Sequence, residues 1–104
     1  MKIFLYSKVG DQSADTLEEL IKTHLPEVET AVYKTIDELS QSLRHPIEDL
    51  CVAIPFISNQ EDLKNIFSIR YLFQSTRIIL LLPDKTAETV ALAFLLQQRG
   101  IGIL

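Results

Sequence analysis

DLCVAIPFISNQEDL, residues 49–63, is an apolar run that passes through Pro55 and is followed at once by residues suited to begin a helix. A short run of this kind, bounded by a helix start, is typical of a buried strand. In a parallel sheet with helical crossovers, ligands and catalytic groups gather just outside the carboxyl ends of the strands. Ile54, Phe56 and Ile57 stand at this strand end, and they suit packing better than chemistry.

The same alternation runs along the rest of the chain. Apolar runs rich in β-branched and aromatic residues occupy residues 3–6, 28–33, 50–57 and 77–82, and stretches of helical spacing separate them. The last residues, GIGIL, supply a short fifth strand. This pattern predicts an α/β fold: a flavodoxin-like three-layer sandwich with a parallel sheet of about five strands in the order 2-1-3-4-5. Residues 77–82 lack alternation, which predicts a central strand covered on both faces.

The spacing of apolar residues also predicts which side of each helix meets the sheet. The inner positions are Ala14, Leu17, Leu20 and Ile21 in the first helix, Ile36, Leu39 and Leu43 in the second, and Leu63, Ile66 and Phe67 in the third. Residues 35–38 and 58–61 match the S/T-x-x-E capping box, which predicts the starts of the second and third helices. Asp11 or Ser13 can cap the first helix, and Asp84 the fourth.

The composition predicts one soluble domain over residues 1–104, because 47% of the residues are apolar and 23% are charged. The net charge of −4 and the scattered basic residues argue against binding to nucleic acid or to an anionic membrane. No apolar stretch approaches the length of a membrane span or a secretory signal, so we expect a cytoplasmic protein with no membrane partner. Cys51 lies inside an apolar run and is expected to be buried and inert.

The sequence contains no motif for a cofactor, a metal or a nucleophile. Both Gly-rich phosphate-binding motifs are absent, so no nucleotide cofactor is expected. His24 and His45 are not at metal-ligand spacing, and no serine has the context of a nucleophile elbow. We therefore expect no catalytic, cofactor-binding or metal-binding residues, and an enzyme is the less favoured interpretation.

The order of the elements, together with PIEDLCVAIPF (46–56) and TRIILLLPD (76–84), resembles the receiver domain of two-component response regulators. The resemblance implies a flavodoxin-like fold that ends with a fifth helix beside the first. No residues follow Leu104 to form that helix, so the final helix is expected to be missing.

The resemblance also implies a set of phosphorylation residues that this chain has lost. With residues 49–50 aligned to the entry of the third strand, the phosphoacceptor aspartate falls at Ile54 and the Mg²⁺-binding acidic pair near Ser7 and Lys8. The hydroxyl position falls at Leu82, and GIGIL holds no lysine. Because an isoleucine can neither bind a hard cation nor accept a phosphoryl group, the resemblance implies the scaffold without the chemistry.

The leading expectation is therefore a degenerate, non-phosphorylatable pseudo-receiver that serves signalling or regulation through a protein partner or as a homodimer. On a helical wheel, Leu92 and Leu96 of the fourth helix point away from its inner stripe. With Leu95 and Ile103 they form the predicted interaction surface, because an exposed apolar surface marks an association site.

The alternative belongs to a different functional class. A small flavodoxin-like enzyme or binding domain would hold an anionic small molecule where the strands end. Lys8, Asn59 and Lys85 lie in the loops that reach this crevice and are its candidate ligand-binding residues.

Overall fold

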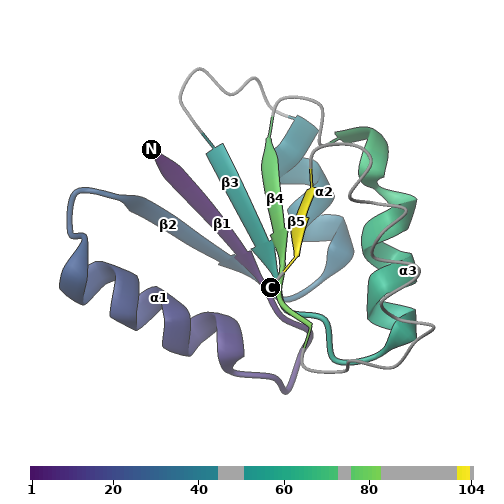
Figure 1. The fold of residues 1–104 in the computed structure, drawn as a ribbon, viewed down its shortest axis with the longest axis horizontal. Helices are drawn as coiled ribbons and strands as arrows, with labels where there is room; N and C mark the ends of the chain where they lie inside the picture. The colour runs from purple at the N-terminus through teal and green to yellow at the C-terminus, as the bar shows by residue number, and fades with distance from the viewer. Residues whose placement is uncertain (45–50, 73–75, 83–100, 104) are drawn as a thin grey trace.

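The computed structural model of the chain describes residues 1–44, 51–72, 76–82 and 101–103, the last three by their backbone. Strands and helices alternate along these residues (Figure 1). The elements are β1 (Lys2–Tyr6), α1 (Ser13–His24), β2 (Glu29–Tyr33), α2 (Ile36–Arg44), β3 (Cys51–Pro55), α3 (Gln60–Ser68), the 3-10 turn η1 (Arg70–Leu72), β4 (Arg77–Leu80) and β5 (Ile101–Ile103).

The strands form a parallel sheet in which β2, β1, β3 and β4 lie side by side in that order. Each of the five residues of β1 pairs with β2 on one side and with β3 on the other, from Lys2 to Tyr6. The backbone of Ile101–Ile103 pairs with β4 as β5. The α/β class and the order 2-1-3-4 are thus as the sequence predicts, and the arrangement is compatible with a flavodoxin-like fold.

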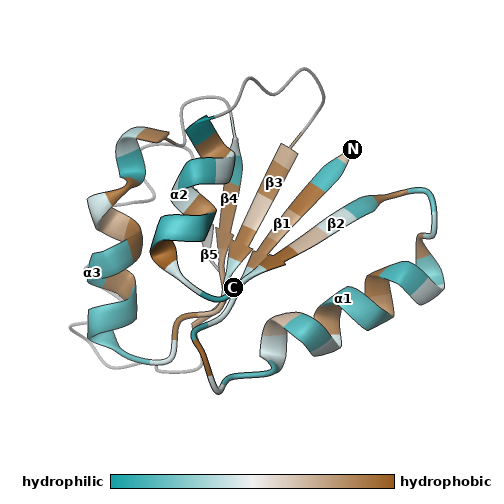
Figure 2. Ribbon diagram, turned by 180° about the vertical axis from the view of Figure 1, so that it is seen from behind, coloured by the Kyte–Doolittle hydropathy of each residue, from teal (hydrophilic) through white to brown (hydrophobic). Residues whose placement is uncertain are grey.

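Two helices cover one face of this sheet. Figure 2 brings α2 in front of the strands, which carry mainly hydrophobic residues. The buried residues on this face come from β1, β3, β4, α2, α3 and the loops between them; they are Phe4, Tyr6, Leu39, Leu43, Cys51, Ala53, Ile57, Leu63, Ile66, Ile69, Ile78, Leu80 and Leu82. We call this side the closed face. The predicted inner sides of α2 and α3 and the burial of Cys51 are confirmed.

Among the described residues, α1 is the helix on the other face. It packs mainly against β1 and β2. The buried cluster there consists of Ile3, Leu5, Ala14 and Ile21, with Leu17, Ile54 and Phe56 among the half-buried side chains packed against it. We call this side the open face. The three layers of the predicted sandwich are therefore present, and among the described residues one outer layer holds two helices and the other holds one.

One expectation about this open face is wrong. Leu20 was expected to face the sheet, yet it is 52% exposed, because α1 turns the line of Ala14 and Ile21 toward β1 and β2. Residues 77–82 are expected to form a central strand, and β4 does lie between β3 and β5. In β4, Ile78 and Leu80 are fully buried and Ile79 is half-buried.

Several sequence predictions fall outside the described residues. They concern Asp84, Lys85, Leu92, Leu95 and Leu96, and also the side chain of Ile103. Within the part of the chain that the structure describes, every helix is too short or too polar to cross a membrane.

Candidate functional site

The loop that follows β1 carries the first half of the candidate site. Its backbone turns between Lys8 and Asp11, where the Asp11 N–H donates to the Lys8 carbonyl at 3.0 Å. Gly10 has φ of 92°, a value that the third position of such a turn requires and that side chains with a Cβ rarely adopt. Val9 is 75% exposed at the tip of the turn. The turn brings Asp11 to the start of α1.

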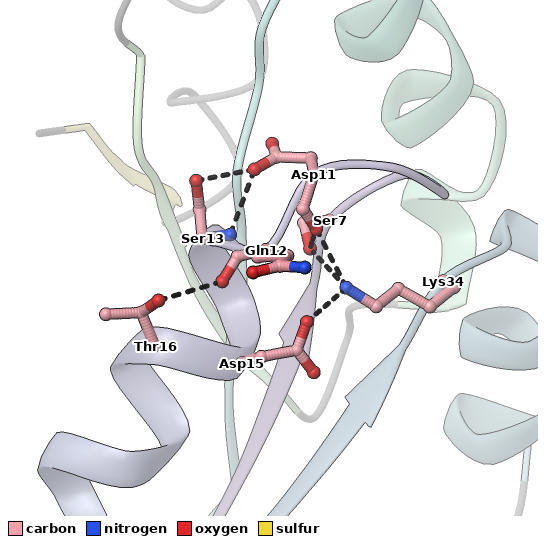
Figure 3. A network of polar contacts seen from close by, with 7 residues as sticks. All are labelled: Ser7, Asp11, Gln12, Ser13, Asp15, Thr16 and Lys34. Carbon is pink, nitrogen blue, oxygen red and sulfur yellow. Dashed lines mark hydrogen bonds and ion pairs between the residues drawn. The ribbon is translucent and has the colours of Figure 1, made fainter.

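Lys34, directly after β2, lies at the centre of a polar network at these strand ends (Figure 3). Its Nζ donates to the Asp11 carbonyl at 2.8 Å and to Ser7 Oγ at 3.2 Å, and it forms an ion pair with Asp15. Ser7 is fully buried, and its hydroxyl donates to the same Asp11 carbonyl at 2.8 Å. Lys34 thus ties the end of β2 to the β1 loop and to the first turn of α1.

Asp11 closes the start of α1. Its Oδ1 accepts from the Ser13 N–H at 2.9 Å and from Ser13 Oγ at 2.6 Å. These two hydrogen bonds hold the pKa of the Asp11 carboxyl below its usual value, and Lys34 and Lys8 add a smaller effect in the same direction. The expectation that Asp11 or Ser13 is the N-cap is wrong, because the N-cap is Gln12 and its side chain makes no capping hydrogen bond. Asp11 lies one residue earlier and accepts from the first residue of the helix.

The start of α3 is closed in a related way, one residue later than the sequence suggests. Asn59 is the N-cap, and its Oδ1 accepts from the Asp62 N–H at 2.8 Å. The Asp62 carboxylate reaches back to accept from both the Ser58 N–H and the Ser58 hydroxyl. The expected box at 58–61 is therefore wrong, because Asp62 and not Glu61 lies on the buried side of the first turn. The box at 35–38 does use Thr35, whose Oγ1 accepts from the Glu38 N–H.

Asp62 connects the two halves of the site. It is buried, and Lys8 Nζ lies 3.9 Å from its Oδ2. Tyr6, buried at the end of β1, has a raised pKa because of its burial and, to a lesser degree, the negative charge of Asp62. Lys8 and Asn59, two of the three residues expected in a ligand crevice, thus both contact Asp62, while Lys85 lies outside the described residues.

This polar arrangement is suited to holding loops in place. A buried Ser7 beside Lys34 has the composition of a serine–lysine dyad, but the Lys34 ammonium already serves three acceptors, among them Asp15. At the start of α1 the Ser13 N–H donates to Asp11, and at the start of α3 the Asp62 N–H donates to Asn59. Among the described residues, no group of three or more His, Cys, Asp or Glu side chains could hold a metal ion. Lys34 had no signal in the sequence, because its partners lie 19 to 27 residues away.

The positions that a receiver would use for phosphorylation carry apolar side chains with packing roles. Ile54 pairs with Leu5 in the sheet and packs on the open face. Leu82 is 4% exposed and belongs to the closed face. The strand ends are joined by backbone bonds, from the Phe56 N–H to Tyr6 and from the Ile57 N–H to Leu81. The carboxyl end of β3 is therefore part of the hydrophobic core.

An apolar groove on the open face begins beside this polar network. Its volume is about 560 Å³, and it lies between α1 and the ends of β3 and β4. The lining residues are Leu17, Leu20, Phe56 and Leu81, with Asp11, Gln12, Ser13 and Thr16 at the polar rim. Sequence reasoning missed this groove, since periodicity places Leu20 on the inner side of α1. A signal that could have indicated it is the small side chain of Ala14, which is the fully buried residue of α1.

Comparisons of the chain with protein-family models, with curated proteins and with solved structures find no match.

Proposed function

We propose that this chain is a non-phosphorylatable pseudo-receiver with a flavodoxin-like fold, and that it acts as a protein–protein interaction module in signalling or regulation. One observation carries the proposal. At the carboxyl ends of the strands the polar side chains satisfy one another, while the apolar groove beside them stays open. An open apolar surface is what a binding module needs, whereas phosphoryl transfer needs available carboxylate oxygens.

The carboxylates nearest the strand ends support this proposal. Asp11 is held by Ser13 at the start of α1, and Asp62 is held by Ser58 and Lys8 at the start of α3. To accept a phosphoryl group, either carboxylate would have to give up the contacts that close its helix. The residue at the phosphoacceptor position of the receiver resemblance, Ile54, has no oxygen to offer.

The alternative, an anionic small molecule held by Lys8 and Asn59, has less support. Lys8 is already paired with Asp62, and the Asn59 side chain already caps α3. An anion at Lys8 would lie beside the buried negative charge of Asp62 and would have to compete with it. Repulsion between like charges in a partly buried site makes this costly.

Phosphorylation is tested by incubating the chain with Mg²⁺ and acetyl phosphate and measuring its intact mass. We expect the unmodified mass, because Ile54 has no oxygen and the described carboxylates Asp11 and Asp62 are held by hydrogen bonds at the starts of their helices. An acid-labile adduct of one phosphoryl group per chain would overturn the proposal. In that event the variants Asp11→Asn and Asp62→Asn would locate the acceptor.

The alternative is tested by titrating the labelled chain with inorganic phosphate and following backbone amide shifts. We expect no saturable shifts at Lys8 and Asn59. Saturable shifts that disappear in Lys8→Met would favour the anion-binding function and would count against the interaction module.

A further inference from the structure

Three oxygen atoms near the carboxyl ends of β1 and β2 converge on one point, and Lys34 Nζ occupies that point (Figure 3). They are Ser7 Oγ at 3.2 Å, the Asp11 carbonyl oxygen at 2.8 Å and a carboxylate oxygen of Asp15. They belong to the residue after β1, the loop that follows and the first turn of α1. An ammonium group has three N–H donors and no acceptor, so each donor has one oxygen as its partner.

The pairing of β1 with β2 brings Lys34 to these oxygens. Tyr6 pairs with Tyr33 at the ends of the two strands. The pairing continues one step further, because the Ser7 N–H donates to the Tyr33 carbonyl at 3.3 Å. Lys34 therefore starts beside Ser7, and its side chain extends from there to α1. The sheet register, rather than the loop, determines where the ammonium group lies.

The three oxygens are arranged to accept hydrogen bonds from a cation. The Ser7 hydroxyl donates its own proton to the Asp11 carbonyl at 2.8 Å, so that its oxygen is left to accept from Lys34. The Asp11 carbonyl accepts from both groups. Ser7 is fully buried, and Asp15 adds a carboxylate. Acceptors that face one another in a partly buried place are stabilised by a positive charge between them.

The charge and the number of ligands at this point fit an ammonium group better than a divalent metal ion. One carboxylate balances one positive charge, and the other two ligands are a hydroxyl and a carbonyl. Calcium takes about six to eight oxygen ligands, and magnesium requires a nearly ideal octahedron. The neighbouring lysine Lys8 is directed elsewhere, since its Nζ lies 3.9 Å from Asp62. Lys34 is therefore the described lysine that fills this point.

We propose that Ser7 Oγ, the Asp11 carbonyl and the Asp15 carboxylate form a binding site for a primary ammonium group, which the chain fills with its own Lys34. The bound charge holds the loop after β1 in place. Asp11 and Ser13 are part of the polar rim of the groove, so the site also fixes this rim. The inference goes beyond the proposed function, because it concerns what holds the loop and not what the groove binds.

The site is tested by emptying it and supplying the ammonium group separately. Lys34→Ala removes the end of the side chain, and n-propylammonium replaces the carbons and the nitrogen that are lost. We expect backbone amide hydrogen exchange in residues 8–15 to become about 10-fold faster in the variant. Added n-propylammonium should restore the parent rates with a saturable dependence on its concentration. Propan-1-ol, which has the same carbon chain without the charge, should restore nothing.

Two further variants show whether the recovery belongs to this site. Lys22→Ala is the matched control, because it removes a lysine that is 63% exposed and pairs with Glu18. Added n-propylammonium should change its exchange rates no more than those of the parent chain. In the second variant, Asp15→Asn is added to Lys34→Ala and removes the charged oxygen of the site. It should abolish the recovery by n-propylammonium.

Three results would overturn the proposal: unchanged exchange in Lys34→Ala, an equal recovery with propan-1-ol, or saturable recovery with Mg²⁺ but not with n-propylammonium. If Lys34→Ala does not fold, the same titration is followed by far-ultraviolet circular dichroism. A signal that n-propylammonium fails to restore then counts against the site. The phosphodonor experiment is independent: a phosphoryl adduct removes the proposed function, whereas failure of the recovery removes the ammonium site alone.

Discussion

The helices on the two faces of the sheet are held in place by different contacts. On the closed face, α2 and α3 bury leucine and isoleucine side chains against three strands, and Leu39, Leu63 and Ile66 are at most 1% exposed. On the open face, α1 buries Ala14 and Ile21 and leaves Leu20 half in solvent. The closed face is thus stabilised by apolar burial, whereas the described part of the open face leaves a large apolar side chain and a groove exposed.

The small apolar contact of α1 is supplemented by polar contacts at one end. Lys34 joins Ser7, Asp11 and Asp15, and the Asp11 carboxylate accepts hydrogen bonds from Ser13, the first residue of the helix. These polar contacts help to fix the position of α1, because its apolar contact with the sheet is small. A helix that is held by polar contacts at its start can leave part of its apolar side exposed, as α1 does at Leu20. This division of roles can be tested by matched substitutions on the two faces.

The largest effect is expected from Leu63→Ala on the closed face. It should lower the free energy of unfolding by about 2–5 kcal/mol, because it removes a fully buried side chain and leaves a cavity. The same substitution on the open face, Leu20→Ala, should change it by less than about 0.5 kcal/mol. Urea denaturation at low micromolar concentration measures both. If the two variants lose similar amounts of unfolding free energy, the two faces do not differ in the way described.

An intermediate effect is expected from Lys34→Met. This change removes the donor that Ser7, Asp11 and Asp15 share, and it should cost about 1–3 kcal/mol by leaving partly buried acceptors without their partner. Hydrogen exchange should speed up in α1 more than in α3. The control is Lys22→Met, whose side chain is 63% exposed and paired with Glu18; it should cost less than about 0.5 kcal/mol. Equal effects would mean that the network does not position α1.

The smallest effect is expected in acid. Because folding lowers the pKa of Asp11, its contribution to stability is present above the unfolded value of about 3.9 and is lost as the pH falls through the lower folded value. Asp11→Asn keeps a residue able to cap and should flatten this part of the stability curve below about pH 4. The control Asp37→Asn removes an exposed carboxylate from α2. Urea midpoints between pH 2 and 6, a range chosen around the ordinary carboxyl value of about 3.9, measure the slope. If the urea midpoint of Asp11→Asn depends on pH in the same way as that of the parent chain, the hydrogen bonds from Ser13 do not stabilise the ionised Asp11 carboxylate.

Much of the fold was predictable because it depends on local patterns. Apolar runs that alternate with helical spacing predict the α/β class, and the order of four strands follows from the rules of parallel sheets. The inner sides of α2 and α3 were predictable too, since both helices pack fully on the sheet. Thr35 was recognisable as a cap because its partner Glu38 is three residues away.

Less of the candidate site was predictable. Lys8 and Asn59 were identified from the strand order, but their shared contact, Asp62, was not. The shift of the cap from Ser58 to Asn59 depends on which carboxylate of α3 is turned inward. The sequence allows the N-cap of α3 to be Ser58 or Asn59, and only the packing of the first turn selects Asn59.

The sequence by itself determined which side of each element is apolar, because that property repeats along the chain with the period of the helix or the strand. The tertiary structure alone decided how far α1 reaches across the sheet, and therefore that Leu20 is exposed and a groove opens beside Phe56 and Leu81. It also brought Lys34 to Ser7, 27 residues away. Periodicity describes an element's own surface, whereas coverage and long-range pairing depend on where neighbouring elements lie.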